Sequence, residues 1–445
     1  MINIKKLSAL EISKAIKGEI IGKNTYVDKL TIDSRELTDG SSIFFAIRGE
    51  KYDGHMHVEE AIKHGAKIIV SDVNINVLVT VIKVQNTTKA FGLFAKKYKR
   101  KAKIIAVTGS SGKTTTKNMI ISVLKQKYTV CGTHENQNNE IGVPLTLLSI
   151  KNEDICVVEM GMRKKGDIDW LSYISDPDIC VVTNCGSAHI EYLETKENIV
   201  KAKMEIINFK PDVVFLPNEE KFKKYEKNHI RFVYLDTNDT LKSCFHNNNG
   251  ITFEVMDILG NKKSVNLNSI CIYNSVNALF AYRIGEELGL KHDEILNGLL
   301  ACKMENRHED RIDIGNMQVV LDCYNASFEG VKMALYSIVE YSRKINKTPC
   351  LLLGDMLELG DDSDRLHIEI GKYCLELGVR TLFTYGNVSR IISKRLNYGI
   401  HLNDINEALD KLLKLSLSPN VLLVKGSRKM QLESIVYKMK EEYDE

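Results

Sequence analysis

The chain has 445 residues, of which 44% are hydrophobic and 27% are charged. A single hydrophobic core rarely grows beyond about 250–300 residues, so we expect two or three domains, and the composition excludes a disordered or fibrous protein. Because 61 basic residues face 58 acidic ones, the net charge is only +3, which excludes a broad electrostatic surface for nucleic acid or membrane.

The cysteines and the N-terminal segment bear on the cellular compartment. Ten cysteines occur without any Cys-x-x-Cys pair, and Cys185 with His189 lacks the second ligand pair of a zinc site. Segment 1–18 has no long apolar stretch and no small-residue cleavage site, and no window reaches 18 uninterrupted apolar residues. We therefore expect a cytoplasmic protein with reduced thiols. Separately, we expect a monomer.

The first part of the chain mixes short helical patterns with apolar runs, such as Lys67–Val70 and Val79–Val84. A basic stretch with helical character follows over residues 89–103, and Ile104–Val107 then indicates a buried strand that opens a second unit. We predict a first domain over residues 1–86.

In the second unit, apolar runs of four residues alternate with polar loops and helical stretches. The runs are Ile155–Val158, Ile179–Val182 and Val213–Leu216. This alternation predicts a parallel sheet flanked by helices, with a β-containing excursion over residues 226–270 before a helix at Asn274–Leu288. The second domain is predicted to span residues 87–303.

The same rhythm of strand and helix returns in a third unit, over residues 304–445. Its apolar runs are Val319–Leu321, Leu351–Leu353, Leu382–Tyr385 and Val421–Val424. The repetition predicts a Rossmann-like, doubly wound domain. The whole chain is thus predicted to be an α/β protein of three domains.

The strongest local motif, Val-Thr-Gly-Ser-Ser-Gly-Lys-Thr-Thr-Thr, follows the strand Ile104–Val107 and precedes a helical stretch. Glycines let backbone N–H groups turn toward phosphate oxygens, the lysine reaches the terminal phosphates, and the hydroxyl of Thr114 binds Mg²⁺. Val107 stands where the usual pattern has its first glycine, so the loop is a shortened form; the alternative is a Gly/Ser-rich turn with a solvated lysine. The predicted nucleotide-binding residues are Thr108, Gly109, Ser110, Ser111, Gly112, Lys113, Thr114 and Thr115.

Three residues nearby are candidates for a metal site. Glu159 and His189 each end one of two consecutive predicted strands, so we expect them at the same edge of the sheet. The alternatives to metal binding are an exposed glutamate at a strand end and a structural histidine. Lys203 falls on the apolar face of a helical segment, whereas Lys201 points to water. An inward lysine requires a partner or a modification such as carbamylation; from spacing alone, a lysine whose ammonium reaches solvent is favoured.

Together with four further segments, these residues resemble the Mur ligase family over nearly the whole chain. The third-domain segments look like those of the member that adds D-alanyl-D-alanine to a UDP-N-acetylmuramoyl-tripeptide. The segments are Asp33-Ser34-Arg35 with 44–50 and Asp53-Gly54-His55; Thr133–Pro144; Leu353–Gly360 with His367; and Val424–Arg428.

The resemblance implies a reaction in peptidoglycan precursor synthesis. ATP phosphorylates the carboxylate of a UDP-muramoyl peptide, an amine attacks the acyl phosphate, and phosphate leaves. Lys113 and Thr114 would hold phosphates and Mg²⁺, Glu159 the first Mg²⁺, and His189 with carbamylated Lys203 a second one. The remaining nucleotide contacts implied are Asn274 and Asn277 at adenine, Asp322, and either Arg307 or Arg311 at the phosphates, with Arg311 weakly preferred.

The resemblance also assigns substrate residues. They are Ser34, Arg35, Arg48, Asp53 and His55 in the first domain; Thr133, Asn136, Asn138 and Asn139 in the substrate loop; and Tyr324, Asn325, Asp355, Glu358, Lys425 and Ser427 in the third domain. The chain departs from the family at Tyr273, where histidine is usual, at Cys271, where glycine is usual, and at Ser327, Phe328 and Gly330, near the incoming amine.

Two alternatives remain, the first suggested by the altered stretch and the second from a different class of protein. The chain could be a paralogue that joins another amine or peptide, or a nucleotide switch or scaffold that keeps the phosphate loop. The third residue of the stem peptide, lysine or diaminopimelate, stays open.

Overall fold

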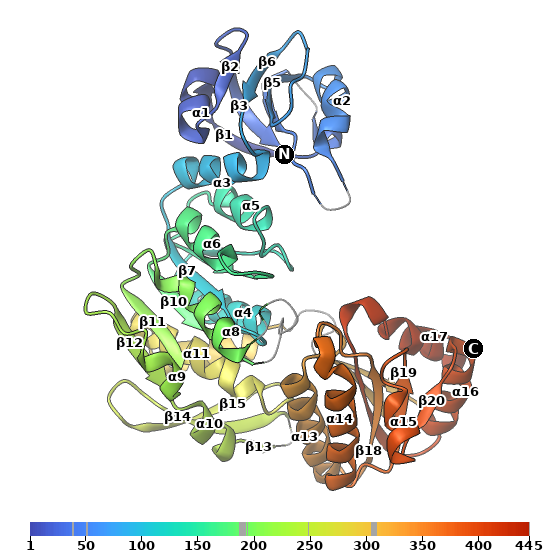
Figure 1. Ribbon diagram of the computed structural model, residues 1–445. Coiled ribbons are helices and arrows are strands. Elements are labelled where there is room, and N and C mark those ends of the chain that lie inside the picture. Colours follow the sequence, from blue (N-terminus) through green and yellow to red (C-terminus); the bar gives the residue numbers. More distant parts are fainter. Residues whose placement is uncertain are drawn as a thin grey trace.

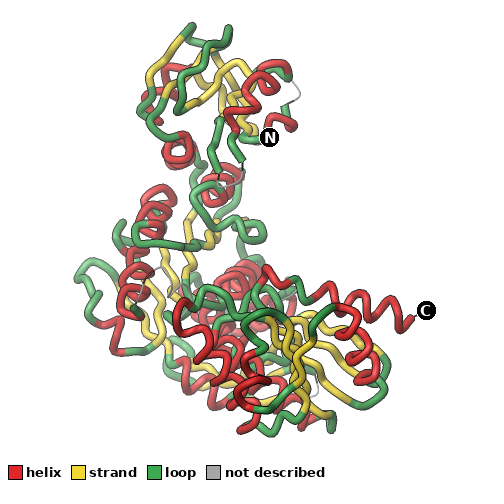
Figure 2. Tube along the Cα trace, turned by 45° about the vertical axis from the view of Figure 1, so that its right-hand side comes forward, coloured by secondary structure: helices red, strands yellow, loops and turns green. Residues whose placement is uncertain are grey.

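The computed structural model describes residues 1–37, 40–49, 52–186, 193, 195–247, 249–303 and 309–444. These residues form three six-stranded sheets, one after another along the chain, and a smaller three-stranded sheet (Figures 1 and 2). Helices cover the sheets. The predicted α/β class with three domains is confirmed.

The N-terminal sheet is mixed, with strand order β1-β3-β4-β5-β6-β2. Its four middle strands are parallel, and β1 and β2 pair antiparallel at the two edges. The strands are β1 (Ile2–Ser8), β2 (Glu19–Ile21), β3 (Tyr26–Thr31), β4 (Ser42–Phe45), β5 (Ala66–Ser71) and β6 (Thr80–Lys83); the helices are α1 (Ala9–Ile16) and α2 (Val58–Lys63).

The central sheet is parallel throughout, with strand order β12-β11-β10-β7-β9-β8. Its core strands are continuous runs of buried apolar residues because helices cover both faces. The strands are β7 (Lys103–Thr108), β8 (Val130–Gly132), β9 (Ile155–Glu159), β10 (Ile179–Val182), β11 (Val213–Pro217) and β12 (Arg231–Leu235).

The helices of the central domain divide between the two faces of its sheet. One face carries α4 (Lys113–Leu124), α11 (Asn274–Glu287) and α12 (His292–Ala301), and the other carries α3 (Thr87–Tyr98), α5 (Gly142–Ser149), α6 (Asp167–Ser175) and α8 (Lys196–Lys203). Helix α3 packs against α1 as well as α5 and α6, and its Phe91 and Phe94 join the N-terminal core to the central one.

Residues 226–270 were predicted as a β-containing excursion from the central domain, but only part of this segment leaves the central sheet. It begins with β12, which extends the parallel sheet beside β11, and continues with α10 (Thr237–Ser243). A small antiparallel sheet then follows, made of β13 (Phe245–His246), β14 (Ile251–Met256) and β15 (Lys262–Leu267).

The C-terminal sheet has strand order β16-β17-β21-β18-β19-β20 and is parallel except for the hairpin of β16 and β17. The strands are β16 (Asp310–Ile314), β17 (Met317–Leu321), β18 (Thr348–Gly354), β19 (Thr381–Tyr385), β20 (Ile400–Leu402) and β21 (Asn420–Lys425). Two cores lie on opposite faces, one under α13 (Phe328–Lys344), α14 (Ser363–Glu376) and α15 (Ile391–Leu396), the other under α16 (Ile405–Ser416) and α17 (Glu433–Asp444).

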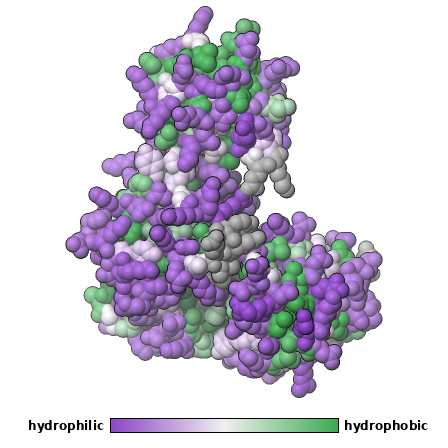
Figure 3. Space-filling model, viewed as in Figure 1, coloured by the Kyte–Doolittle hydropathy of each residue, from purple (hydrophilic) through white to green (hydrophobic). Residues whose placement is uncertain are grey.

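The three domains are arranged around the central one. The N-terminal domain joins it through α3, the C-terminal domain lies beside it, and these two outer domains stand apart in both views (Figures 1 and 2). Hydrophilic residues cover most of the face in Figure 3. Within the described ranges, every helix is too short or too polar to cross a lipid bilayer.

Candidate active site

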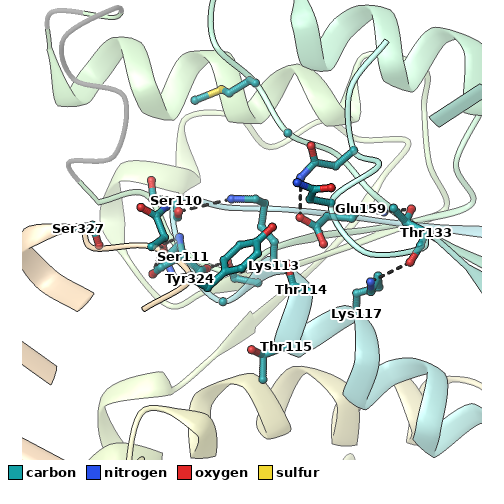
Figure 4. Close-up of a pocket in the computed structure, with 18 of the residues that line it drawn as sticks. Ser110, Ser111, Lys113, Thr114, Thr115, Lys117, Thr133, Glu159, Tyr324 and Ser327 are labelled. Atoms are coloured by element: carbon teal, nitrogen blue, oxygen red, sulfur yellow. Dashed lines mark hydrogen bonds between the residues drawn. The ribbon is translucent and has the colours of Figure 1, made fainter. Parts of the chain in front are cut away.

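A large cleft between the central and C-terminal domains gathers most of the residues predicted to bind nucleotide and substrate. From the central domain it is lined by residues 110–115, 133–136, 138–140, Glu159, Asn274 and Asn277, and from the C-terminal domain by Asp322, Tyr324, Asn325, Glu358, Lys425 and Ser427. Figure 4 shows part of this lining. These residues follow the carboxyl ends of parallel strands or begin helices, which is where open α/β sheets bind ligands.

The phosphate loop joins β7 to α4, as the sequence predicts. Gly109 and Gly112 have φ of 156° and 77°, and a Cβ at either position would overlap Thr183 Oγ1 or Asn277 Oδ1. Both positions therefore require glycine. Thr108 is fully buried and donates to the Met160 carbonyl at 2.9 Å, so its hydroxyl faces β9 instead of the cleft.

Lys113 folds back over this loop. Its Nζ donates to the Gly109 carbonyl at 2.9 Å and to that of Ser110 at 3.5 Å. Burial lowers the pKa of Lys113, and the Glu159 carboxylate opposes that shift. Asn184 fixes the other side of the loop, because its side-chain oxygen accepts from the Ser111 N–H at 3.0 Å.

The Glu159 carboxylate has the features of a metal ligand. The side chain is 1% exposed, and Oε1 accepts from Asn138 Nδ2 at 2.8 Å. Oε2 is buried without a hydrogen-bond partner among the described residues. A buried carboxylate oxygen in that state favours a cation, and Thr114 lines the same cleft.

Lys203 lies near the end of α8 and is 1% exposed, whereas Lys201 on the same helix is exposed. The inward direction inferred from helical spacing is therefore observed, and the alternative of an ammonium that reaches solvent is wrong. Burial and the positive charge of Lys113 lower the pKa of Lys203 to about 7. The positive charge of Lys113 in the phosphate loop thus acts on Lys203, and the negative charge of a carbamate on Lys203 would neutralise it.

The two asparagines expected at adenine begin α11 and are already engaged with protein groups. Asn274 donates to Ser269 Oγ at 3.0 Å and to Glu309 Oε2 at 3.1 Å, and accepts from Asn277 Nδ2 at 2.9 Å. Both asparagines line the cleft and are at least 95% buried.

A buried ion pair connects two strands of the C-terminal domain at the cleft. Lys425 Nζ lies 2.7 Å from Asp322 Oδ2, and both side chains are less than 8% exposed. Tyr273, which stands where the family usually has histidine, donates to the same Asp322 oxygen at 3.0 Å. The substituted residue therefore joins α11 of the central domain to the C-terminal domain.

The third-domain loops divide into supporting and cleft-lining residues. Asp355 accepts hydrogen bonds from the N–H groups of Asn387, Val388 and Ser389, and it is absent from the described lining of the cleft. His367 accepts from the Met356 N–H at 3.0 Å. Asp355 thus supports the loop, while Glu358, in the left-handed region with φ of 64°, lines the cleft.

The altered stretch at residues 327–330 forms the start of α13. Ser327 caps the helix, and its Oγ accepts from the Gly330 N–H at 3.2 Å. Serine is a favoured N-cap residue, which explains how this stretch begins a helix. Ser327 and Gly330 both line the cleft.

The first-domain residues predicted to bind UDP sugar form a separate group at the carboxyl edge of β3, β4 and β5. Ser34 Oγ donates to Glu60 Oε2 at 2.7 Å, and Asp53 binds both His55 Nδ1 at 2.6 Å and Arg48 Nε at 3.2 Å. Arg35 pairs with Asp33 at 2.6 Å. In the described structure these residues lie outside the cleft.

Of three further predicted residues, Arg311, His189 and Arg307, only Arg311 is among the residues that the structure describes. Arg311 lies on β16, where its guanidinium donates to Asn268 Oδ1 at 2.9 Å, and it is absent from the described lining. The resemblance implied a phosphate contact by either Arg307 or Arg311, and the choice between them depended on the length of the hairpin before Val319. His189 and Arg307 lie outside the described residues.

Two cleft residues were not singled out from the sequence. Asn184 holds the phosphate loop, and its place after a buried strand was the available signal. Lys117 is 1% exposed and donates to the Thr133 carbonyl at 2.8 Å. Its four-residue spacing from Lys113 on α4 was the signal for that residue.

Comparisons with known proteins agree along the chain. Residues 26–99 match the Mur ligase family catalytic domain, residues 107–285 the Mur ligase middle domain, and residues 306–428 the Mur ligase glutamate ligase domain. The chain is 31% identical to UDP-N-acetylmuramoyl-tripeptide–D-alanyl-D-alanine ligase from Bacillus subtilis, over 97% of this chain and 98% of that protein.

Two solved structures share the fold. MurF from Acinetobacter baumannii has a TM-score of 0.88 at 25% identity and covers 99% of this chain and 100% of its own. MurF from Thermotoga maritima, in complex with ADP, has a TM-score of 0.83 at 24% identity, over 94% and 98% of the two chains. The chain belongs to the Mur ligase family of ATP-dependent ligases that form amide bonds.

Proposed function

We propose that this ligase joins D-alanyl-D-alanine to a UDP-N-acetylmuramoyl-tripeptide, in cytoplasmic peptidoglycan precursor synthesis. The main support for ATP-dependent ligation is that one cleft contains Lys113, the phosphate loop and the buried Glu159 carboxylate. The choice of substrates is supported by the name of the Bacillus subtilis relative, which aligns over nearly the whole of both chains.

In the proposed reaction the protein mainly positions and neutralises charge. Gly109 and Gly112 let the loop N–H groups approach the ATP phosphates, and Lys113 releases the loop carbonyls to contact the terminal phosphate. The ADP complex of the Thermotoga maritima structure supports this nucleotide assignment.

Glu159 and Thr114 are the described residues that fit a Mg²⁺ ion, because Glu159 offers a buried oxygen that no described donor satisfies. Bound there, Mg²⁺ would neutralise charge on the transferring phosphoryl group. We propose carbamylated Lys203, with His189, for a second Mg²⁺.

The C-terminal residues at the cleft are proposed to receive the incoming amine. Tyr324, Asn325, Glu358 and Ser427 line its C-terminal wall. Attack of the amine nitrogen on the acyl phosphate forms the amide bond and releases inorganic phosphate.

The first-domain residues lie apart from the cleft, so the UDP-peptide must extend between domains or the domains must approach. Approach of the domains would also exclude water. A phosphate contact by Arg311 likewise requires the domains to rearrange.

Phosphate release tests the proposal. Purified protein with ATP, Mg²⁺, UDP-N-acetylmuramoyl-tripeptide and D-alanyl-D-alanine should release phosphate, and omission of either the UDP-peptide or the dipeptide should abolish the release. Stem peptides with lysine and with diaminopimelate at the third position are assayed separately. Release without dependence on UDP-peptide would instead indicate a nucleotide switch.

A second candidate, a ligase for another amine, is motivated by the altered residues Ser327 and Gly330 in the cleft wall. A panel of dipeptides and free amines, each with the same UDP-peptide, separates the two. D-alanyl-D-alanine should give the highest kcat/KM; a clearly better amine would replace it as the substrate.

A further inference from the structure

A second lysine of the phosphate-loop helix is buried beside the cleft, and the proposed chemistry does not use it. Lys117 follows Lys113 by four residues on α4, so the two lie one turn apart on the same side of the helix. Lys117 is 1% exposed. Burial of an ammonium is costly unless it is hydrogen-bonded, so its contacts identify what it stabilises.

One of these contacts is to the residue at which β8 passes into the substrate loop. Lys117 Nζ donates to the Thr133 carbonyl at 2.8 Å (Figure 4). Thr133 is held at two more points, because its N–H donates to the Val157 carbonyl at 3.0 Å and its Oγ1 accepts from the Glu159 N–H at 2.9 Å. One threonine thus connects α4 to β9.

The connection continues into the substrate loop. Asn138 Nδ2 donates to Glu159 Oε1 at 2.8 Å, and the Asn138 carbonyl accepts from the Gly161 N–H at 2.8 Å. The loop is therefore attached at its start, through Thr133, and again at Asn138. Glu159 lies at the centre of both attachments.

We propose that Lys117 is a positioning residue for the ligation. Its ammonium fixes Thr133, and through Thr133 it holds the Glu159 carboxylate and residues 133–139 in register with the phosphate loop. The kinetic consequence of this inference rests on the proposed function. The attachment of the substrate loop does not, because it is present in the ligand-free protein. It assigns to α4 the coupling of the nucleotide loop to the substrate loop.

Amide hydrogen exchange on the ligand-free protein tests the attachment directly. Lys117→Met removes the charged donor at similar volume. We expect peptides that cover residues 133–142 and 156–166 to exchange at least about tenfold faster than in the wild-type protein, because the loss of a charged hydrogen bond releases the loop. Peptides of the C-terminal domain should be unchanged.

Lys99→Met is the matched control. Lys99, on the same domain, also donates to a main-chain carbonyl, that of Ser175, but it is absent from the described lining of the cleft. Its substitution should leave exchange of residues 133–142 unchanged. Equal acceleration in both variants would overturn the proposal, because it would indicate general loosening of the domain.

Kinetics supply the second readout. In Lys117→Met we expect kcat to fall about 10- to 100-fold and the KM for UDP-peptide to rise, with ADP affinity within about twofold of wild type. Thr133→Val removes the hydrogen bond from the Glu159 N–H to Thr133 Oγ1 while keeping Lys117. This variant replaces Lys117→Met in the test if Lys117→Met fails to fold. The double variant should lose little more than the worse single variant, because both act through one chain of contacts.

The possible outcomes separate this inference from the proposed function. Unchanged exchange, or additive kinetic losses in the double variant, would overturn the positioning role. If the wild-type protein makes no product with D-alanyl-D-alanine, the proposed function fails, while faster exchange in Lys117→Met would still support the attachment.

Discussion

Burial and the ammonium of Lys113 together lower the pKa of Lys203 to about 7. The two lysines belong to different helices, α4 and α8, and the positive charge of Lys113 acts on Lys203 across them. A lysine with such a pKa has a substantial neutral population near neutral pH, and the neutral amine is the form that adds CO₂. The relationship supports the carbamate proposed at Lys203.

The first prediction concerns that carbamate. Lys203→Ala should lower the rate of phosphate release by at least about 100-fold, because an oxygen anion near Mg²⁺ is lost. Short carboxylates such as acetate or formate should restore part of the rate by occupying its place. Lys201→Ala, a change to the exposed lysine two residues earlier, should keep nearly full activity. A Lys203→Ala variant with an unaffected rate would refute the carbamate.

The second prediction is the pH dependence of stability. An unfolded lysine has a pKa of about 10.4, and folded Lys203 has one of about 7, so between these values the unfolded chain binds the extra proton. The Lys203 contribution therefore makes the free energy of unfolding rise with pH across that window and reach its lowest value below pH 7. Lys203→Met should be more stable than wild type near pH 6, and the difference should shrink toward pH 9.

Thermal melts of both ligand-free proteins in CO₂-free buffer, from pH 6 to pH 9, measure this difference. Only the difference between the two proteins matters, because all other titrating groups are shared. A difference that stays constant across the range would show that Lys203 has an ordinary pKa in the folded protein.

The third prediction concerns Glu159. Glu159→Gln keeps the shape of the side chain but removes the charge of the buried oxygen that lacks a described partner. We expect the Mg²⁺ concentration for half-maximal activity to rise at least about tenfold, since Mg²⁺ prefers carboxylate oxygen. Glu153→Gln, beyond the opposite end of β9, is the control and should keep the wild-type Mg²⁺ dependence. Equal Mg²⁺ dependence in all three proteins would exclude Glu159 as a ligand.

The fourth prediction concerns the buried pair of Lys425 and Asp322. Lys425→Met leaves the Asp322 carboxylate buried without its cation, which should lower the free energy of unfolding by about 3–5 kcal/mol. The double variant with Asp322→Asn should recover part of this loss. Lys414→Met breaks an exposed pair with Asp410 and should cost under about 1 kcal/mol. Thermal denaturation of the three variants checks the order; equal losses for Lys425→Met and Lys414→Met would contradict it.

Local sequence patterns predicted much of this architecture. The apolar runs at Ile155–Val158 and Ile179–Val182 became β9 and β10, because a strand buried on both faces is apolar throughout. The phosphate loop was recognisable because its glycines, lysine and flanking elements are contiguous in the sequence. Helical spacing placed Lys203 on the inward face of its helix, but spacing alone favoured an ammonium that reaches solvent, whereas the side chain is 1% exposed.

Contacts between distant segments were beyond that reasoning. The hydrogen bond from Tyr273 to Asp322 joins two domains, and the place of Arg311 depends on how a hairpin packs against Asn268. Asp355 is occupied by three backbone N–H groups that lie more than 30 residues away in sequence. No periodicity encodes such pairings, which arise when the elements pack.

The mass of the reaction product tests the central claim most directly. After incubation with ATP, Mg²⁺, UDP-N-acetylmuramoyl-tripeptide and D-alanyl-D-alanine, mass spectrometry should find the UDP-peptide heavier by one D-alanyl-D-alanine less one water, with one ADP and one phosphate formed for each product. Recovery of the UDP-peptide at its original mass, under conditions in which the protein binds ATP, would contradict the account.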